Sequence, residues 1–302
     1  MNDTQEPQTF PSRASAIKVV GSTIFLLALT AIVLGLLIAM KSDAHSGQLC
    51  VAYLLFCFFY ALHLASGIRV HPVAYILPSL FVYVEFTTPL ATLFFYFFRT
   101  VLPGSPSTDP SLSNALLSTF IGSGLMEELM KSVPALIGLL LASRPKTAVN
   151  SSARLLNLLR CSTPMRGMLI GVAAGAGFVF VDIFYQVTPH SGIYVMSQRH
   201  FAGGIEEFTA LSQRVVSGIT SHVVWTGISG FFIGLSARHP RYLAILLATA
   251  WLLPAAFHTV WNVSAFLGEW RWVKLTLPLP TFVACFLIAK TSERRESSRL
   301  RA

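Results

Sequence analysis

The chain has 302 residues, of which 54% are hydrophobic and only 12% are charged, and its formal net charge is +9. An ordinary soluble domain carries about 25% charged residues, so this composition excludes most soluble folds and indicates that lipid solvates part of the apolar surface. The cations gather in short gaps between apolar runs, notably from Arg144 to Arg166, and in the tail from Lys290 to Arg301. Cations in these gaps are typical of cytosolic loops, so we expect membrane lipid and not nucleic acid as a partner.

Apolar runs of the length that spans a membrane recur along the chain. A spanning helix needs roughly 20 mostly apolar residues. We therefore predict an all-α, polytopic membrane protein, a bundle of about eight transmembrane helices. The eight runs are Ile17–Met40, Cys50–Ser66, Val73–Phe98, Asn114–Leu141, Arg166–Val187, Gln213–Leu235, Tyr242–Leu267 and Val273–Ala289.

The gaps between these runs suggest an organisation and an orientation. We expect residues 1–16 to form a disordered cytosolic tail, 17–112 the N-terminal helices, 113–267 a core of four helices, and 268–302 the last helix with a basic cytosolic tail. Eight spans place both termini on one side, and the basic gaps after the fourth and sixth runs fall on that side too. This pattern predicts a protein of the plasma (inner) membrane with both termini in the cytosol. The long gap Thr188–Ser212 then faces the opposite side.

The fifth run contains glycines at Gly167, Gly171 and Gly175, which lie on one face of a helix. In lipid, such a face lets two helix backbones approach closely. The series therefore predicts that this helix is central in the bundle and tightly packed.

The fourth run holds three ionisable residues, Glu127, Glu128 and Lys131. A charge at the bilayer centre costs roughly 2.5–3.5 kcal/mol on insertion scales, so such residues need a reason to be there. Glu127 and Lys131 are four residues apart, in the order that favours an ion pair. One lysine stabilises one ionised carboxylate, and the other should hold its proton more tightly. Two carboxyls in different protonation states suit general acid–base chemistry, although a structural ion pair between helices fits equally well.

The next three runs each hold one further candidate, namely Asp182, His222 and His258. Each has a structural alternative: a carboxylate near a helix end, or a hydrogen-bonded core histidine. Each histidine, however, has a polar residue one turn later, Thr226 and Asn262, which could orient the ring.

These candidates share a similar depth. At 1.5 Å per residue, Asp182 and His258 lie roughly 24 Å from the cytosolic boundary, and His222 and Glu127 roughly 15–20 Å from the opposite one, in a core about 30 Å thick. We therefore expect Glu127, Glu128, Asp182, His222 and His258 to meet in one polar site on the outer side of the midplane. All the buried charge identified in this way lies in the second half of the chain.

The order of these motifs resembles the PrsW-type membrane proteases, relatives of the CAAX-processing and bacteriocin-immunity membrane proteases. The resemblance covers about Ser113–Val263 and implies a protease-like core and an enzyme that cleaves a peptide bond of a membrane-spanning protein or peptide. The matching motifs are Glu127-Glu128-Leu129-Met130-Lys131, Phe178-Val179-Phe180-Val181-Asp182, His222, and His258-Thr259-Val260-Trp261-Asn262. The second motif normally ends in glutamate, and here it ends in Asp182, whose carboxylate reaches less far.

Two mechanisms fit these residues. In one, Glu127 or Glu128 is a general base for water, while His222 and His258, oriented by Asn262, polarise the carbonyl. In the other, His222, His258 and Asp182 hold Zn²⁺ and another glutamate takes the proton from bound water. No His-Glu-x-x-His run is present, which slightly favours the first.

Two other classes of function remain open at this stage. A proton- or cation-coupled transporter also places ionisable residues within its helices, although the two halves of this chain show no internal duplication. A non-catalytic membrane scaffold would use the same carboxylates and asparagine to bind helices together.

Overall fold

A computed structural model describes residues 25–33, 44–68, 70–105, 111–144, 156–187, 194–196, 205–264, 268 and 272–299. The described residues are almost all helical, as predicted, and the exception is a short antiparallel hairpin that pairs Tyr185 with Met196. The tail 1–16, most of the first predicted span and much of the gap Thr188–Ser212 lie outside the described residues.

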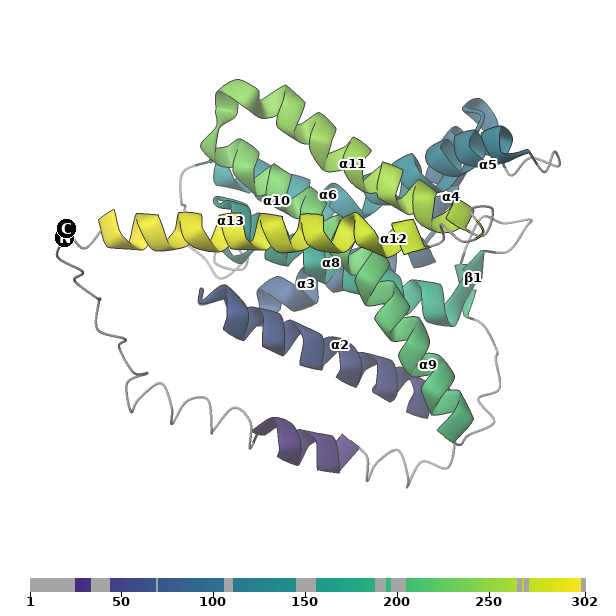
Figure 1. Cartoon of the computed structure of the whole chain (residues 1–302), viewed down its shortest axis with the longest axis horizontal. Helices are drawn as coiled ribbons and strands as arrows, with labels where there is room; N and C mark the ends of the chain where they lie inside the picture. Colours follow the sequence, from purple (N-terminus) through teal and green to yellow (C-terminus); the bar gives the residue numbers. More distant parts are fainter. Residues whose placement is uncertain are drawn as a thin grey trace, which may run out of the picture.

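Figure 1 shows the helices packed side by side in a bundle. The long elements are α2 (Ala44–Ser66), α3 (Val73–Thr87), α6 (Met126–Ala142), α8 (Pro164–Phe184), α9 (Ile205–Gly218), α10 (Val224–Arg238), α11 (Leu243–Val263) and α13 (Pro278–Arg299). Shorter helices are α4 (Leu90–Tyr96), α5 (Leu112–Thr119) and α12 (Val273–Thr276), and the strands are β1 (Tyr185–Val187) and β2 (Tyr194–Met196).

Helix α8 lies in the middle of the bundle, as the glycine series predicted (Figure 1). It packs against α3 on one side and α10 on another, and also contacts α6. A Cβ atom on Gly171 would lie 2.1 Å from the Thr226 carbonyl oxygen, and one on Gly175 would lie 2.6 Å from that of His222. Only glycine permits this approach, so the α8 and α10 backbones touch directly.

Three of the helical paths are irregular. The third predicted run, Val73–Phe98, is broken at Thr88 and Pro89, where α3 and the segment Leu90–Val101 meet at a bend of 64°. The pyrrolidine ring of Pro89 cannot donate a backbone hydrogen bond, which explains the break at this point. Two π-helical turns, η2 (Phe120–Leu125) and η3 (Ile219–Val223), interrupt the paths that lead into α6 and α10.

The predicted count of eight transmembrane helices is not confirmed. Among the described residues, five helices are long and apolar enough to cross a membrane, or six if the bent pair forms one span. The first predicted run is described only over residues 25–33, which are helical. The fourth run forms α5, η2 and α6 in succession without a break, but it contains Glu127, Glu128 and Lys131 and is not among these candidate spans.

Candidate active site

The acidic pair and the lysine of α6 are all buried in the protein interior. Lys131 and Glu128 are fully buried, and Glu127 is 7% exposed. The Lys131 Nζ lies 2.5 Å from Glu128 Oε1 and 4.0 Å from Glu127 Oε2. The lysine therefore neutralises mainly Glu128, three residues away, and not Glu127, which the sequence spacing favoured.

Two of the three π-helical segments among the described residues, η2 and η3, lie where site residues enter the bundle; the third is η1 (Phe97–Val101). The turn η2 ends at Leu125, two residues before Glu127, and η3 contains His222 itself. Each π-helical turn widens the helix and displaces the residues beyond it around the axis, and such bulges are frequent at functional sites. Here they aim the side chains of two separate helices toward α11, which carries His258.

His258 is held between the two glutamates. Its Nδ1 lies 3.0 Å from Glu128 Oε1, and its Nε2 lies 3.7 Å from Glu127 Oε2. The Trp225 ring stacks on the imidazole at 4.7 Å, which fixes the plane of the ring. Because a carboxylate paired with lysine accepts hydrogen bonds, Glu128 takes the Nδ1–H of His258 and leaves the Nε2 lone pair directed at Glu127.

His222 is held from the other side by Lys131. The Lys131 Nζ lies 3.1 Å from His222 Nδ1. An ammonium only donates hydrogen bonds, so Nδ1 is the acceptor and the neutral ring carries its proton on Nε2. The Phe178 ring packs edge-on against this imidazole at 4.5 Å and also receives the Lys131 ammonium at 4.4 Å. Lys131 therefore connects Glu128 and His222 in one network.

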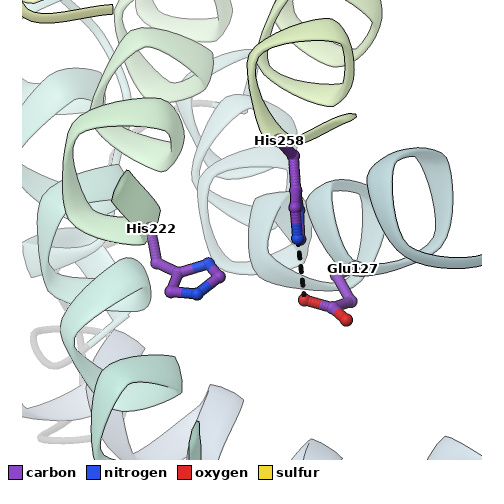
Figure 2. Close-up of side chains that lie close together, drawn as sticks. All are labelled: Glu127, His222 and His258. Atoms are coloured by element: carbon purple, nitrogen blue, oxygen red, sulfur yellow. Dashed lines mark ion pairs between the residues drawn. The ribbon is translucent and has the colours of Figure 1, made fainter. Parts of the chain in front are cut away.

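Three potential metal ligands converge at the centre of this network. One donor atom each from Glu127, His222 and His258 lie within 4.8 Å of one another, and the side chains come from three separate helical paths (Figure 2). Donors around a tetrahedral zinc at about 2.0–2.1 Å lie roughly 3.4 Å apart. A small closure of the side chains would therefore meet the geometry of an open, three-ligand site.

The chemistry of the three donors also fits a metal. The Glu128–His258 contact is the carboxylate–histidine arrangement that supports a metal-bound imidazole. His222 would have to bind through Nε2, because Lys131 occupies Nδ1. Since Nε2 carries the proton in this tautomer, metal binding would require the ring proton to move to Nδ1, and His222 would then no longer accept the hydrogen bond from Lys131.

Within the described residues, Asp182 and Asn262 form no hydrogen bond or ion pair with this group. Asp182 is exposed, and its carboxylate lies 3.9 Å from Arg214, which also donates to the Asp182 carbonyl. Asn262 is exposed, while both ring nitrogens of His258 face glutamates. The Thr226 hydroxyl donates to the backbone carbonyl of His222 and does not orient the ring. The structure therefore groups Glu127, not Asp182, with the two histidines.

Sequence reasoning missed two ionisable residues in the first half of the chain. Glu85 of α3 is 3% exposed, and its Oε2 has no hydrogen-bond partner among the described residues. The expectation that all buried charge lies in the second half is therefore wrong. The sequence contained the signal for Glu85, because this charge lies deep in the apolar run Val73–Phe98. Arg99 donates to the Gly122 carbonyl of η2 and is one of the cations that act electrostatically on Glu127.

Comparison with known proteins identifies the family of the chain. A family model described as "PrsW family intramembrane metalloprotease" matches residues 71–289, which include every element that carries the site. No curated protein and no solved structure matches the chain. The match extends over most of the chain and includes the convergent Glu127, His222 and His258. The chain belongs to the PrsW family of intramembrane metalloproteases and is therefore a hydrolase of peptide bonds.

Proposed function

We propose that this protein cleaves a peptide bond of a membrane-spanning protein substrate at the centre formed by Glu127, His222 and His258. The observation that carries the proposal is the convergence of one carboxylate and two imidazoles within 4.8 Å, in a group that is mostly buried. Ionisable groups among apolar helices are costly to bury, and those that are present usually serve a function. Neither a transporter nor a scaffold is supported by the family match.

The two glutamates take different roles in this proposal. Glu128 has one oxygen engaged by both Lys131 and His258, so it positions these residues. Glu127 makes only long contacts, at 3.7 and 4.0 Å, and it is the more accessible of the two carboxylates. It is therefore free to act on the water that attacks the peptide carbonyl.

A divalent metal fits the same centre. Glu127, His222 and His258 would hold it, and zinc, when bound there, supplies a Lewis acid and a bound water of lowered pKa. The protein residues then orient the site: Glu128 holds His258 in the required tautomer, and Lys131 balances the charge of Glu128. The buried Oε2 of Glu128, which has no partner among the described residues, could accept a hydrogen bond from a water in the site.

A metal-free mechanism is supported by the contact between Lys131 and His222. With Nδ1 accepting from lysine, His222 presents an Nε2–H donor, and such a donor can stabilise the oxyanion that forms when water attacks. In this case Glu127 acts as the general base. The two mechanisms use the same residues and differ in two roles: Glu127 is a metal ligand or the general base, and His222 offers a lone pair or an N–H donor.

Peptide release by the purified protein tests the proposal directly. Single-span substrates are incubated with wild-type protein before chelation, after chelation and after zinc is added back, and the metal content is measured in parallel. We expect chelation to abolish cleavage, zinc to restore it, and active protein to contain stoichiometric zinc. Full activity in metal-depleted protein would contradict the metal mechanism and support the metal-free one.

Substitution of Asp182 by glutamate tests whether the family's usual residue still fits. Asp182 is exposed, and within the described residues its one ion pair is with Arg214. We therefore expect Asp182→Glu to retain at least about half of the wild-type rate of peptide release, or to exceed it. Initial rates of peptide release measure this, with Asp182→Asn as the matched control for charge. Inactivity of Asp182→Glu alone would mean that the site has adapted to the shorter acid.

A further inference from the structure

A cleft of about 850 Å³ lies between the C-terminal parts of α10 and α13, far along both helices from the catalytic centre. Helix α13 packs against α10 (Figure 1). The cleft begins at Leu235 on one helix and at Leu287 on the other. Its size is within the range of small-molecule binding sites.

The walls of the cleft change from apolar to polar along the helices. Leu287 and Ile288 are 56% and 57% exposed, so they offer an apolar surface. One turn further along α13, Thr291 and Ser292 contribute hydroxyl groups, and Arg295 follows at the end. A ligand that matches this gradient has an apolar body and a polar head.

The polar end of the cleft is positively charged. Arg238 is partly neutralised, because it donates to Ser292 Oγ at 2.7 Å and forms an ion pair with Glu296. Arg295, by contrast, is exposed and has no acidic partner within the described part of the chain. His239 adds a ring nitrogen at the same end. Guanidinium groups and hydroxyls of this kind suit a phosphate.

The position of the cleft in the bundle limits what can reach it. The two candidate spans that form it, Leu211–Arg238 and Val273–Glu296, both end at its polar side. If the basic helix ends face the cytosol, the polar side lies at the depth of the lipid head groups and the apolar side at the depth of the acyl chains. The cytosolic leaflet is enriched in anionic lipids, which attract such basic segments.

We propose that the cleft between α10 and α13 is a binding site for an anionic phospholipid. The phosphate is held by Arg295 with His239 and the hydroxyl of Ser292, since the Thr291 hydroxyl already donates to the Leu287 carbonyl. One acyl chain lies along Leu287 and Ile288. The site is separate from the catalytic centre, and the proposal does not depend on the mechanism of peptide cleavage.

Native mass spectrometry of the full-length protein, released from detergent with phosphatidylglycerol or phosphatidylcholine, tests this proposal. We expect wild type to retain phosphatidylglycerol in preference to phosphatidylcholine. Arg295→Ala should weaken retention roughly tenfold, since a hydrogen bond to a charged group contributes about 1.5–3 kcal/mol. Arg294→Ala is the matched control: it removes the same charge from the neighbouring exposed residue, which does not line the cleft.

A second variant separates a cleft from a merely basic surface. Thr291→Trp keeps every charge but fills the space between the helices, so it should also reduce retention of phosphatidylglycerol. Equal losses in Arg294→Ala and Arg295→Ala, with no loss in Thr291→Trp, would overturn the proposal in favour of diffuse attraction. Competition by inorganic phosphate alone at the same concentration, or equal retention of phosphatidylcholine, would also overturn it. Thermal unfolding of each variant confirms that the compared proteins are folded.

Discussion

Glu127→Gln is expected to lower the rate of peptide release by roughly 10²- to 10⁴-fold, the range that a general acid–base group contributes. The amide keeps the size of the side chain but can neither take a proton from water nor bind a metal as an anion. Stability should change little, because the ion-pair contacts of Glu127 are long, at 3.7 and 4.0 Å. Initial rates on a single-span substrate, together with the unfolding temperature in detergent, measure both effects.

Glu128→Gln provides the comparison within the same motif. It should lose activity and stability together, because Lys131 and His258 both lose the negative charge that now accepts their hydrogen bonds. Zinc content of the Glu127→Gln protein then separates the two possible tasks of Glu127: loss of zinc identifies a ligand, and retained zinc with no activity identifies a base. Wild-type activity in Glu127→Gln beside an inactive, stable Glu128→Gln would reverse the roles proposed for the two carboxylates.

Lys131→Met is expected to destabilise the protein by about 3–5 kcal/mol, the cost of leaving a buried charge without its partner. The methionine has a similar length and removes only the ammonium, which is fully buried and 2.5 Å from Glu128. His222 loses its hydrogen-bond donor at the same time. The free energy of unfolding, measured by titration with a denaturing detergent, gives the size of the effect.

Two further variants make this prediction specific to the pair. Lys274→Met removes a lysine that lies over the Trp261 ring, outside the site, and should cost far less. The double substitution Glu128→Gln and Lys131→Met removes both charges and should recover part of the lost stability, because no unpaired charge remains. If Lys131→Met and Lys274→Met unfold at the same detergent concentration, the buried network does not stabilise the fold.

Four of the residues singled out in the sequence lie together in the structure, whereas the predicted count of eight transmembrane helices is not confirmed. Glu127, Glu128, His222 and His258 were identifiable because each is costly in an apolar helix, and their common depth indicated one site. Hydropathy cannot detect the bend of 64° at Pro89, because the sequence stays apolar on both sides of it. The fourth run is continuous in the structure, but its three charged residues lower its hydropathy as a span.

The arrangement within the site depended on geometry that spacing does not contain. Ideal helical spacing favoured a Glu127–Lys131 pair, whereas the lysine lies closer to Glu128 because it also reaches His222 on another helix. Tertiary contacts of this kind override a local preference worth only about 0.2–0.5 kcal/mol. Glu85 was missed for a different reason. Its charge is visible in the sequence, but it was not part of a recognised motif with other ionisable residues.

The direct contact between the α8 and α10 backbones has a consequence for how a substrate enters. At Gly167, Gly171 and Gly175 no side chain separates the two helices, and the contact extends to His222. Two helices packed this closely cannot slide or separate without losing all of these backbone contacts, so they move as a single body. We therefore expect the α8–α10 pair to stay fixed while a substrate peptide approaches the centre, so that any opening for it comes from movement of other elements of the bundle.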